Sequence, residues 1–159
     1  MQRLTQLIHN GTTQDPQTGA SSPPIFQSST FAQPSEGDRR EFTYSRTANP
    51  TRKLLEDLMA ELEHGTAGFA FASGMAAIST CLLLLKPGDH IIVSEDVYGG
   101  TYGILDSLQE NGYLHVSYVP TMDVCRVEAA FTDKTRAVYL ETPSNPTLQV
   151  SDIRVISQL

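Results

Sequence analysis

Apolar positions recur at helical spacing between residues 49 and 65. Asn49-Pro50-Thr51 has the form of a helix start, with asparagine at the N-cap and proline in the first turn. Five apolar residues then fall on one helical face: Leu54, Leu55, Leu58, Met59 and Leu62. His64-Gly65 supplies a stop signal, because glycine is common just past a helix end. The pattern predicts one amphipathic helix over this segment.

Beyond this helix, short apolar runs alternate with amphipathic segments. Strands are predicted at residues 68–72, 90–94, 113–119 and 136–141. Helices are predicted at residues 74–85, 100–112, 124–131 and from 151 onward. Alternation at this spacing is typical of βαβ units, so we expect an α/β fold with a mostly parallel sheet and helices on both of its faces.

The N-terminal residues 1–48 lack this periodicity and are rich in turn formers. GTTQDPQTGASSPP and AQPSEGDRR leave no room for a long helix, so we expect an extended arm of the kind that lies across another subunit. Residues 49–159 then form the main α/β domain. Its last predicted helix runs to Leu159 without a capping signal. We therefore expect the chain to be the front part of a longer protein.

Composition narrows the possible partners. Of the 159 residues, 40% are hydrophobic and 18% charged, which is ordinary for a soluble globular domain. A net charge of −7 without a basic stripe disfavours nucleic acid. Apolar runs are too short for a signal peptide or a membrane span. The two cysteines lack CxxC spacing and the four histidines lie far apart, which suits the cytoplasm and argues against a metal site.

Three loops follow predicted strands, where parallel α/β sheets bind ligands. They are Ala72–Met75, Ser94–Gly100 and Glu141–Pro146. In the first, the free N–H groups of the helix start and the Ser73 hydroxyl favour an anion, and Gly74 lets it approach. A tight turn between two buried elements would give the same pattern. The loop matches neither GxGxxG nor GxxxxGK[ST], which weakens a nucleotide-binding interpretation.

No lysine or arginine lies between Gly65 and Leu85, so the first loop could hold a phosphate without neutralising it. Arg46, close to Tyr44, could supply the charge, although a solvated loop arginine is the simpler interpretation. Tyr98, beside two glycines, could stack on a flat ligand or pack over its own loop. Asn145, between two prolines, could present a fixed amide or belong to a plain turn.

Four motifs in this order resemble one family: YSRTANPT, FASGMAAI, EDVYGGTY and ETPSNPTLQVSDI. The chain is similar to the Cys/Met-metabolism family of pyridoxal-phosphate enzymes, which includes cystathionine β-lyase, γ-lyase and γ-synthase and methionine γ-lyase. The resemblance implies pyridoxal 5'-phosphate as cofactor. It also implies the aspartate-aminotransferase-like fold, known as fold type I, which would be incomplete in this chain.

The resemblance assigns the cofactor phosphate to two groups of residues. Gly74 and Met75 would offer backbone N–H groups, with Ser73 beside them. Tyr44 and Arg46 would reach the same phosphate from the neighbouring subunit of a tight dimer, as part of a homodimer or dimer of dimers. This would explain why the anion loop, Ala72–Met75, carries no charge of its own.

The resemblance also assigns roles at the cofactor ring and the substrate. Tyr98 would stack on the ring and act catalytically by assisting proton transfer. Asn145 would bind the ring's 3-oxygen and, with Ser144 and Tyr44, help to place a sulfur-containing amino acid. The implied activity is β-elimination of cystathionine to homocysteine, pyruvate and ammonia, with γ-synthase, γ-lyase or methionine γ-lyase activity as alternatives.

The chain departs from the family in length, since family members run well over twice as long. The aspartate facing the pyridine nitrogen, the Schiff-base lysine and the arginine for the substrate carboxylate would lie past residue 159. Lys53, Lys86 and Lys134 are its only lysines and none lies in the family's lysine motif. We therefore expect residues 1–159 alone to be inactive. A truncated, non-catalytic homologue that binds a partner subunit and a nucleotide-binding α/β protein are the alternatives of other classes.

Overall fold

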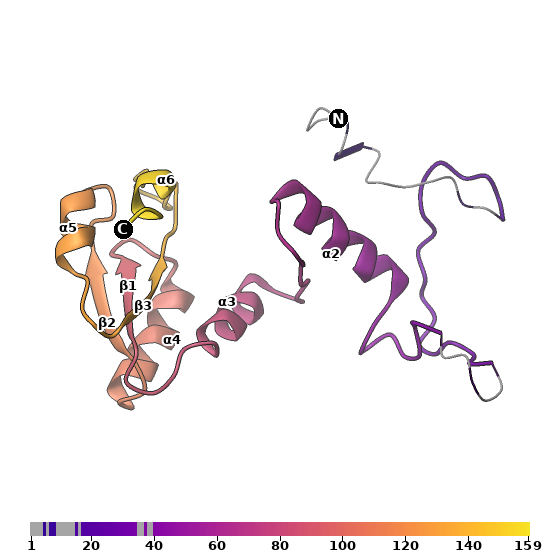
Figure 1. Cartoon of the computed structure of the whole chain (residues 1–159), viewed down its shortest axis with the longest axis horizontal. Helices are drawn as coiled ribbons and strands as arrows, with labels where there is room; N and C mark the ends of the chain where they lie inside the picture. The colour runs from indigo at the N-terminus through magenta and orange to yellow at the C-terminus, as the bar shows by residue number, and fades with distance from the viewer. Residues whose placement is uncertain (1–4, 6, 9–14, 16, 35–36, 38–39) are drawn as a thin grey trace. The chain divides into compact units, whose positions relative to one another are not determined.

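The computed structural model describes residues 5, 7–8, 15, 17–34, 37 and 40–159 (Figure 1). They belong to two compact units, residues 1–70 and 71–159, and each unit is described by itself. Part of the predicted arm 1–48, including His9, lies outside the described residues.

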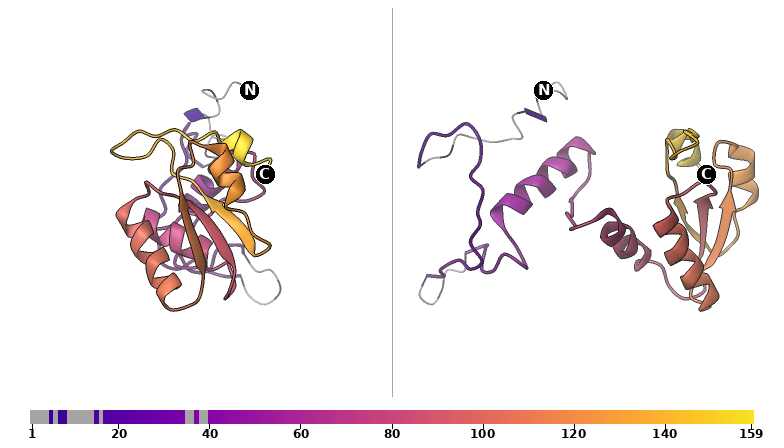
Figure 2. Two further views of the ribbon diagram at one scale, coloured as in Figure 1. Left: turned by 90° about the vertical axis from the view of Figure 1, so that its left-hand side faces the viewer. Right: turned by 180° about the vertical axis from the view of Figure 1, so that it is seen from behind.

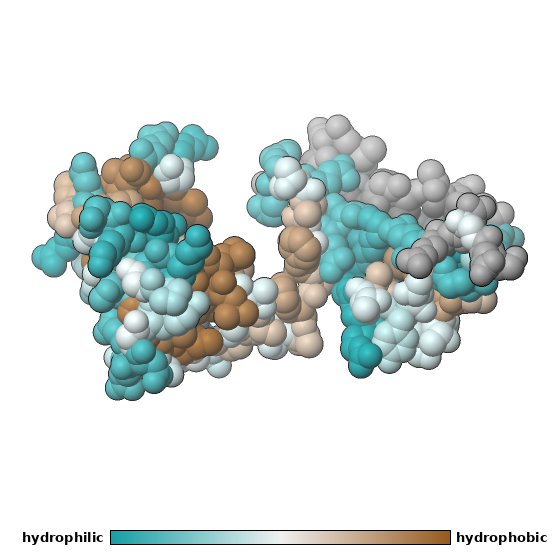
Figure 3. Space-filling view, turned by 60° about the horizontal axis from the view of Figure 1, so that its bottom comes forward, coloured by the Kyte–Doolittle hydropathy of each residue, from teal (hydrophilic) through white to brown (hydrophobic). Residues whose placement is uncertain are grey.

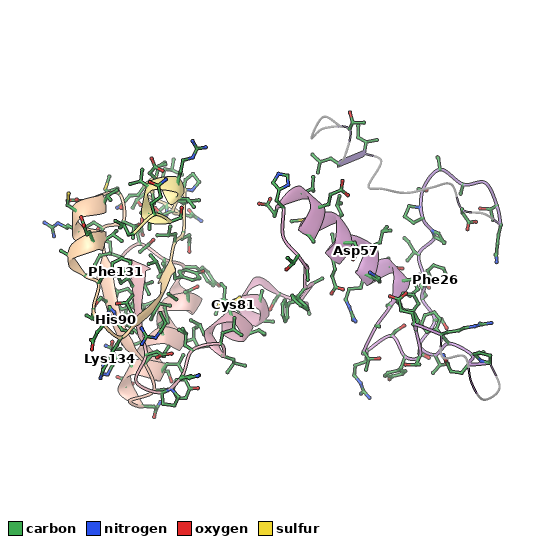
Figure 4. The ribbon with its side chains drawn as sticks, viewed as in Figure 1. Phe26, Asp57, Cys81, His90, Phe131 and Lys134 are labelled. Atoms are coloured by element: carbon green, nitrogen blue, oxygen red, sulfur yellow. The ribbon has the colours of Figure 1, made fainter. Side chains whose placement is uncertain are left out.

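In the first unit, helix α2 spans Pro50–Leu62 and begins as the sequence predicts. Asn49 is the N-cap, and its side-chain oxygen accepts a hydrogen bond from the Thr51 N–H at 2.8 Å. The arm is fixed to this helix start. The Phe26 N–H donates to Thr51 Oγ1 at 2.9 Å, and the Phe26 carbonyl accepts from Asn49 Nδ2 at 3.1 Å (Figure 4).

The C-terminus of α2 closes with a Schellman motif. The Gly65 N–H donates to the Ala60 carbonyl at 2.8 Å, and the His64 N–H donates to the Glu61 carbonyl at 3.3 Å. The predicted stop at His64-Gly65 is confirmed, but the residue with left-handed backbone is His64, with φ of 55°, rather than the glycine.

The predicted strand at 68–72 is wrong. A Cβ atom on Gly68 would lie 2.3 Å from the Glu56 carbonyl oxygen, so the backbone is pressed against α2 there. The Ala70 N–H donates to Glu56 Oε1 at 3.0 Å instead of to a neighbouring strand. Phe69 is 78% exposed and Phe71 44% exposed. An apolar run becomes a strand only beside a pairing partner, and none of the described strands pairs with this one.

The second unit contains a three-stranded parallel sheet. Its strands are β1 (His90–Ser94), β2 (His115–Val119) and β3 (Thr135–Tyr139), in the order β2-β1-β3. Its helices are α3 (Gly74–Leu82), α4 (Gly99–Glu110), α5 (Val124–Ala129) and α6 (Ile153–Ile156). Strands and helices alternate as predicted, with ends that differ from the predicted ones by a few residues.

Helices cover both faces of the sheet (Figure 2). Ile91 and Val93 pack on one face with Leu82 of α3 and Leu105 of α4. On the other face, Ile92 packs with residues of the remaining two helices, Val127 of α5 and Ile156 of α6. Adjacent residues of β1 therefore serve opposite faces, and all five residues of the strand are buried. This arrangement brings the ends of all three strands to one edge, where the loops to the helices begin.

Hydrophobic residues also lie on the surface of the second unit (Figure 3). Leu83 and Leu84, just after α3, are 76% and 82% exposed. Next to them is a groove of about 510 Å³ between this segment and β3. Among the described residues, no helix has both the length and the apolar character needed to cross a bilayer.

Candidate functional site

The first predicted loop forms a capped helix start. Ser73 is the N-cap of α3, and its Oγ accepts a hydrogen bond from the Ala76 N–H at 3.1 Å. This leaves the hydroxyl hydrogen of Ser73 free to donate elsewhere. Gly74 and Met75 are the first two residues of α3, so their N–H groups have no helix carbonyl one turn earlier to donate to. A Cβ atom on Gly74 would have no neighbour within 4 Å, so the space beside these donors is open.

Tyr98 and Met75 meet over Gly100. A Cβ atom on Gly100 would lie 2.7 Å from Tyr98 Cε1 and 3.0 Å from Met75 Sδ. Glycine is therefore required at position 100 for the ring to lie where it does. Tyr98 precedes α4 without capping it through its side chain, and it remains 61% exposed. The anion loop and an accessible aromatic ring thus come together from two different helix starts.

Ser144 and Asn145 follow β3 and differ in surroundings. Ser144 is 1% exposed, and its Oγ accepts from the Gln149 N–H at 3.1 Å and donates to Asp96 Oδ2 at 2.8 Å. Asn145 is exposed, and the peptide bonds Thr142-Pro143 and Asn145-Pro146 are both cis. The amide of Asn145 is thus available to a ligand, whereas the Ser144 hydroxyl is held inside its own loop.

Two carboxylates link the loop after β1 to the loop after β3. Asp96 accepts from the hydroxyls of Thr147 and Ser144, which hold the pKa of its carboxyl below the ordinary value. In the other direction, Glu141 Oε2 accepts from the Tyr98 N–H at 2.8 Å. No motif in the sequence singles out Asp96, Glu141 or Thr147. Their position after adjacent strands was the available signal, because such residues meet at one sheet edge.

A chain of hydroxyl groups lies below these loops. Ser94 Oγ and Thr121 Oγ1 are 2.9 Å apart, and Thr121 Oγ1 and Ser151 Oγ are 2.7 Å apart. All three residues are buried, and the Glu141 N–H donates to Ser94 Oγ at 3.3 Å. The chain joins the ends of β1 and β2 to the segment before α6, so it stiffens the base on which the ligand loops stand.

Two buried hydroxyls near this edge lack partners within the described part of the chain. They are Thr101 Oγ1, in the first turn of α4, and Tyr118 Oη, on β2. Burial, followed by the neighbours Tyr102 and Asp106, raises the pKa of the Tyr118 phenol. The rings of Tyr118 and Tyr102 lie 5.2 Å apart.

The other predicted phosphate ligands, Tyr44 and Arg46, belong to the first unit. The Arg46 guanidinium carbon lies 4.9 Å from the centre of the Tyr44 ring, which is the geometry of a cation–π contact. Both residues are exposed, and within the described residues the Arg46 side chain has no ion pair or hydrogen bond. Its charge is therefore available to an anion.

Helix α2 braces the turn that carries Arg46. The guanidinium of Arg52 donates to the Thr47 carbonyl at 2.6 Å and to the Ser45 carbonyl at 3.3 Å. The Asn49 amide donates to Ser45 Oγ at 2.8 Å. Arg52 was not predicted from the sequence, because an arginine inside an amphipathic helix resembles any solvated residue.

Taken together, the second unit offers amide donors at a helix start, a serine hydroxyl and an open aromatic face at the edge of a parallel sheet. Such a site suits a flat ligand that carries a phosphate. No cluster of three or more His, Cys, Asp or Glu side chains in the described ranges is placed to hold a metal ion. The fold and site are thus those of an α/β protein suited to an anionic, aromatic cofactor.

Comparison with known proteins identifies the family. The model of the family "Cys/Met metabolism PLP-dependent enzyme" matches residues 4–159, so the chain belongs to this family. Cystathionine γ-lyase of Bacillus subtilis is 45% identical over 159 residues, and cystathionine β-lyase of Lactococcus lactis subsp. cremoris is 46% identical over 155 residues. A crystal structure of cystathionine γ-synthase from Xanthomonas oryzae in complex with cystathionine is 34% identical, with a TM-score of 0.90.

These proteins are longer than the chain. It aligns over 100% of its length with 42% of the Bacillus enzyme, and over 98% with 41% of the Lactococcus enzyme. It covers 41% of the Xanthomonas structure through 99% of its own residues. The predicted family, the fold-type-I class and pyridoxal phosphate as the cofactor are confirmed. The roles predicted for individual residues stay predictions.

Proposed function

We propose that this chain is part of a pyridoxal-phosphate-dependent carbon–sulfur lyase that catalyses β-elimination of cystathionine. The observation that carries the proposal is the meeting of Tyr98 and Met75 over Gly100, directly beside the open helix start at Gly74. Membership of a family whose relatives act on cystathionine supports the substrate class. The reaction consumes one water and yields homocysteine, pyruvate and ammonia.

The phosphate would be bound by the start of α3. The N–H groups of Gly74 and Met75 and the Ser73 hydroxyl would donate to its oxygens, and open space beside Gly74 leaves room for them. These donors are neutral. We propose that Tyr44 and Arg46 of a neighbouring subunit supply the hydroxyl and the positive charge, in a homodimer or a dimer of dimers.

The ring would lie against Tyr98, whose exposed face offers a stacking surface. Asn145 would donate to the ring's 3-oxygen and help to orient the substrate carboxylate, with Ser144 holding the loop from inside. When bound, pyridoxal phosphate supplies an electron sink for the negative charge that develops at the substrate Cα. The Tyr98 hydroxyl would assist proton transfer at the reacting atoms.

The same residues serve β- and γ-reactions, because both begin with loss of the Cα proton. γ-Elimination and γ-replacement need a further proton movement at Cβ. Cystathionine γ-lyase, γ-synthase and methionine γ-lyase activities are therefore the alternatives to the β-lyase. The cytoplasm is the proposed compartment.

Product analysis tests the proposal. The full-length protein is incubated with pyridoxal phosphate and cystathionine, and the products are identified. Pyruvate and homocysteine are expected. Cysteine with 2-oxobutyrate would contradict the β-lyase assignment and support a γ-lyase, whereas a protein that binds no pyridoxal phosphate would contradict the proposed function as a whole.

A further inference from the structure

The two residues proposed to contact the cofactor ring, Tyr98 and Asn145, stand on different loops. Tyr98 follows β1 and Asn145 follows β3, and these strands are hydrogen-bonded neighbours. Both side chains are exposed. Neither has a side-chain hydrogen bond to the rest of the described residues that would set its distance from the other. Something else in the structure must fix the spacing between the two loops.

Asp96 provides a link from the first loop to the second. The hydroxyls of Ser144 and Thr147 both donate to the same oxygen, Asp96 Oδ2. Each hydroxyl has one hydrogen, so neither has a second one for the 2.8 Å contact between the two hydroxyl oxygens. The carboxylate is therefore the acceptor that holds these two oxygens side by side.

The loop after β3, to which Asp96 is hydrogen-bonded, is held together by hydrogen bonds of Ser144. The Ser144 N–H donates to the Gln149 carbonyl at 3.0 Å, and the Leu148 N–H donates to the Ser144 carbonyl at 2.9 Å. The Gln149 N–H donates to Ser144 Oγ at 3.1 Å. Asn145 follows Ser144 directly, so a displacement of Ser144 moves Asn145 with it.

Glu141 provides the reciprocal link, from the second loop to the first. Its Oε2 accepts from the Tyr98 N–H at 2.8 Å, at the residue that precedes α4. The backbone of Glu141 is held in turn, because its N–H donates to the buried Ser94 Oγ at the end of β1. Each loop thus carries one carboxylate that binds the other loop.

We propose that Asp96 is a positioning residue that, with Glu141, sets the spacing between Tyr98 and Asn145 and so orients the cofactor ring. This inference rests on the proposed function, since it takes both residues to face that ring. In this role Asp96 acts on neither ring nor substrate directly. Its effect passes through Ser144, the buried neighbour of Asn145.

Loss of Asp96 should disturb the orientation of the cofactor ring more than the affinity for the cofactor. The phosphate donors at α3 do not depend on Asp96, so a variant should still bind the cofactor. Misplacement by about 1 Å of a group that orients the reacting atoms can cost on the order of 10²-fold in rate. Loss of Asp96 should therefore lower kcat more than it raises KM, and should alter the ring's asymmetric environment.

The test compares Asp96→Ala and Asp96→Asn in the full-length protein loaded with pyridoxal phosphate. The readouts are visible circular dichroism per bound cofactor, the dissociation constant of the cofactor, and kcat and KM. Asp96→Ala is expected to lose most of the dichroism and about 10²-fold in kcat. Asp96→Asn should retain most of both, because one amide oxygen can accept from the two hydroxyls that share Oδ2.

Two further variants complete the design. Glu95→Gln removes a neighbouring exposed carboxylate and should match the wild type. Thr147→Val removes one donor with little change of shape and should shift the same readouts in the same direction as Asp96→Ala, so the test survives if Asp96→Ala does not fold. Unchanged dichroism and kcat in Asp96→Ala or Thr147→Val would overturn the positioning role alone. A wild type that binds no pyridoxal phosphate would overturn the proposed function and this role with it.

Discussion

Tyr98 presents two chemical groups at the proposed site, a ring and a hydroxyl, and substitution can separate them. Tyr98→Phe keeps the ring over Gly100 and should keep cofactor binding, while kcat falls by the hydroxyl's share of proton transfer, on the order of 10²-fold. Tyr98→Ala removes the stacking surface as well. It should weaken binding and shift the cofactor absorbance band. Spectral titration with pyridoxal phosphate and steady-state rates measure both effects, and identical behaviour of the two variants would contradict a stacking role.

The unpartnered hydroxyl of Tyr118 gives a second prediction at the residue scale. Its oxygen is buried without a hydrogen-bond partner among the described residues, so Tyr118→Phe should remove a penalty of about 1–3 kcal/mol and raise the apparent unfolding midpoint. Tyr113→Phe is the matched control. The Tyr113 hydroxyl donates to the Leu85 carbonyl at 3.3 Å, and its loss should cost about 1 kcal/mol. Equal destabilisation by both variants in thermal unfolding would show that Tyr118 has a partner.

Among the elements, those with local signals were predictable from the sequence. Asn49-Pro50 carries its own N-cap for α2, and Ser73 does the same for α3. The bounds of β1, residues 90–94, were predicted correctly, because a strand buried on both faces is read from a short run of apolar residues. The run at 68–72 looks the same in sequence. Whether such a run becomes a strand depends on a neighbour, which local sequence does not encode.

In the candidate site, too, the features with a local sequence signal were predictable and those that depend on tertiary contacts were not. Ser73 and Gly74 were predictable because a helix start offers free amides whatever surrounds it. The proximity of Met75 and Tyr98 beside Gly100, and the hydrogen bond between Asp96 and Ser144, join segments far apart in sequence. Packing of α3 against α4 brings the first pair together, and the pairing of β1 with β3 brings the second pair together. The resemblance named Ser144 and Asn145 as a pair, and the structure separates them into a buried residue and an exposed one.

A buried histidine links the three strands at the sheet edge opposite the proposed site. His90, the first residue of β1, is buried, with Nδ1 2.7 Å from Thr135 Oγ1 of β3 and Nε2 2.9 Å from Ser117 Oγ of β2. One ring thus joins all three strands. Burial, and then the neighbouring His115, lower the pKa of His90 from its ordinary value of about 6.5.

The lowered pKa of His90 determines whether the free energy of unfolding rises or falls with pH. The unfolded chain takes up a proton near pH 6.5 while folded His90 stays neutral, so the stabilisation is complete above that pH and is lost as the pH falls below it. The slope is at most about 1.4 kcal/mol per pH unit for one proton. Denaturant unfolding between pH 8 and pH 5 measures it.

His90→Gln should flatten that pH dependence, at some cost in stability at pH 8. A cavity of about 220 Å³ lies beside His90 and is also lined by His115, Thr132, Asp133 and Lys134. Figure 4 labels His90 and Lys134 at this edge of the sheet. A profile for His90→Gln as steep as that of the wild type would contradict the assignment of the pH dependence to His90.

At the scale of the whole molecule, the proposed site is distributed. Tyr44 and Arg46 belong to one compact unit, and the anion loop, Tyr98 and Asn145 belong to the other. The first unit carries a positive charge at Arg46 that is unpaired among the described residues, and the second carries uncharged N–H donors at the start of α3. A phosphate site would need both. Sharing of the site between subunits, which we propose, would provide both. It would also make cofactor binding depend on assembly.

The two lysines of the second unit lie far from the proposed site, and the amine of Lys53 in the first unit is paired with a carboxylate. Lys53 belongs to the first unit, where Asp57 lies 2.7 Å from its amine and, by hydrogen bonding to it, raises the pKa of Lys53. An amine held protonated is a poor nucleophile. Lys86 and Lys134 precede β1 and β3, at the sheet edge opposite Tyr98. Each strand has five residues, so that edge is about 16 Å away.

We therefore predict that residues 1–159 alone form no specific covalent bond to pyridoxal phosphate and turn over no amino acid. The purified chain is mixed with equimolar pyridoxal phosphate, reduced with borohydride, and digested for peptide mapping. Weak labelling spread over all three lysines is expected, because each amine reacts only as a surface group. Full labelling of a single lysine, together with pyruvate released from cystathionine, would contradict the prediction. Such a result would mean that Lys53, Lys86 or Lys134 reaches the aldehyde of the bound cofactor.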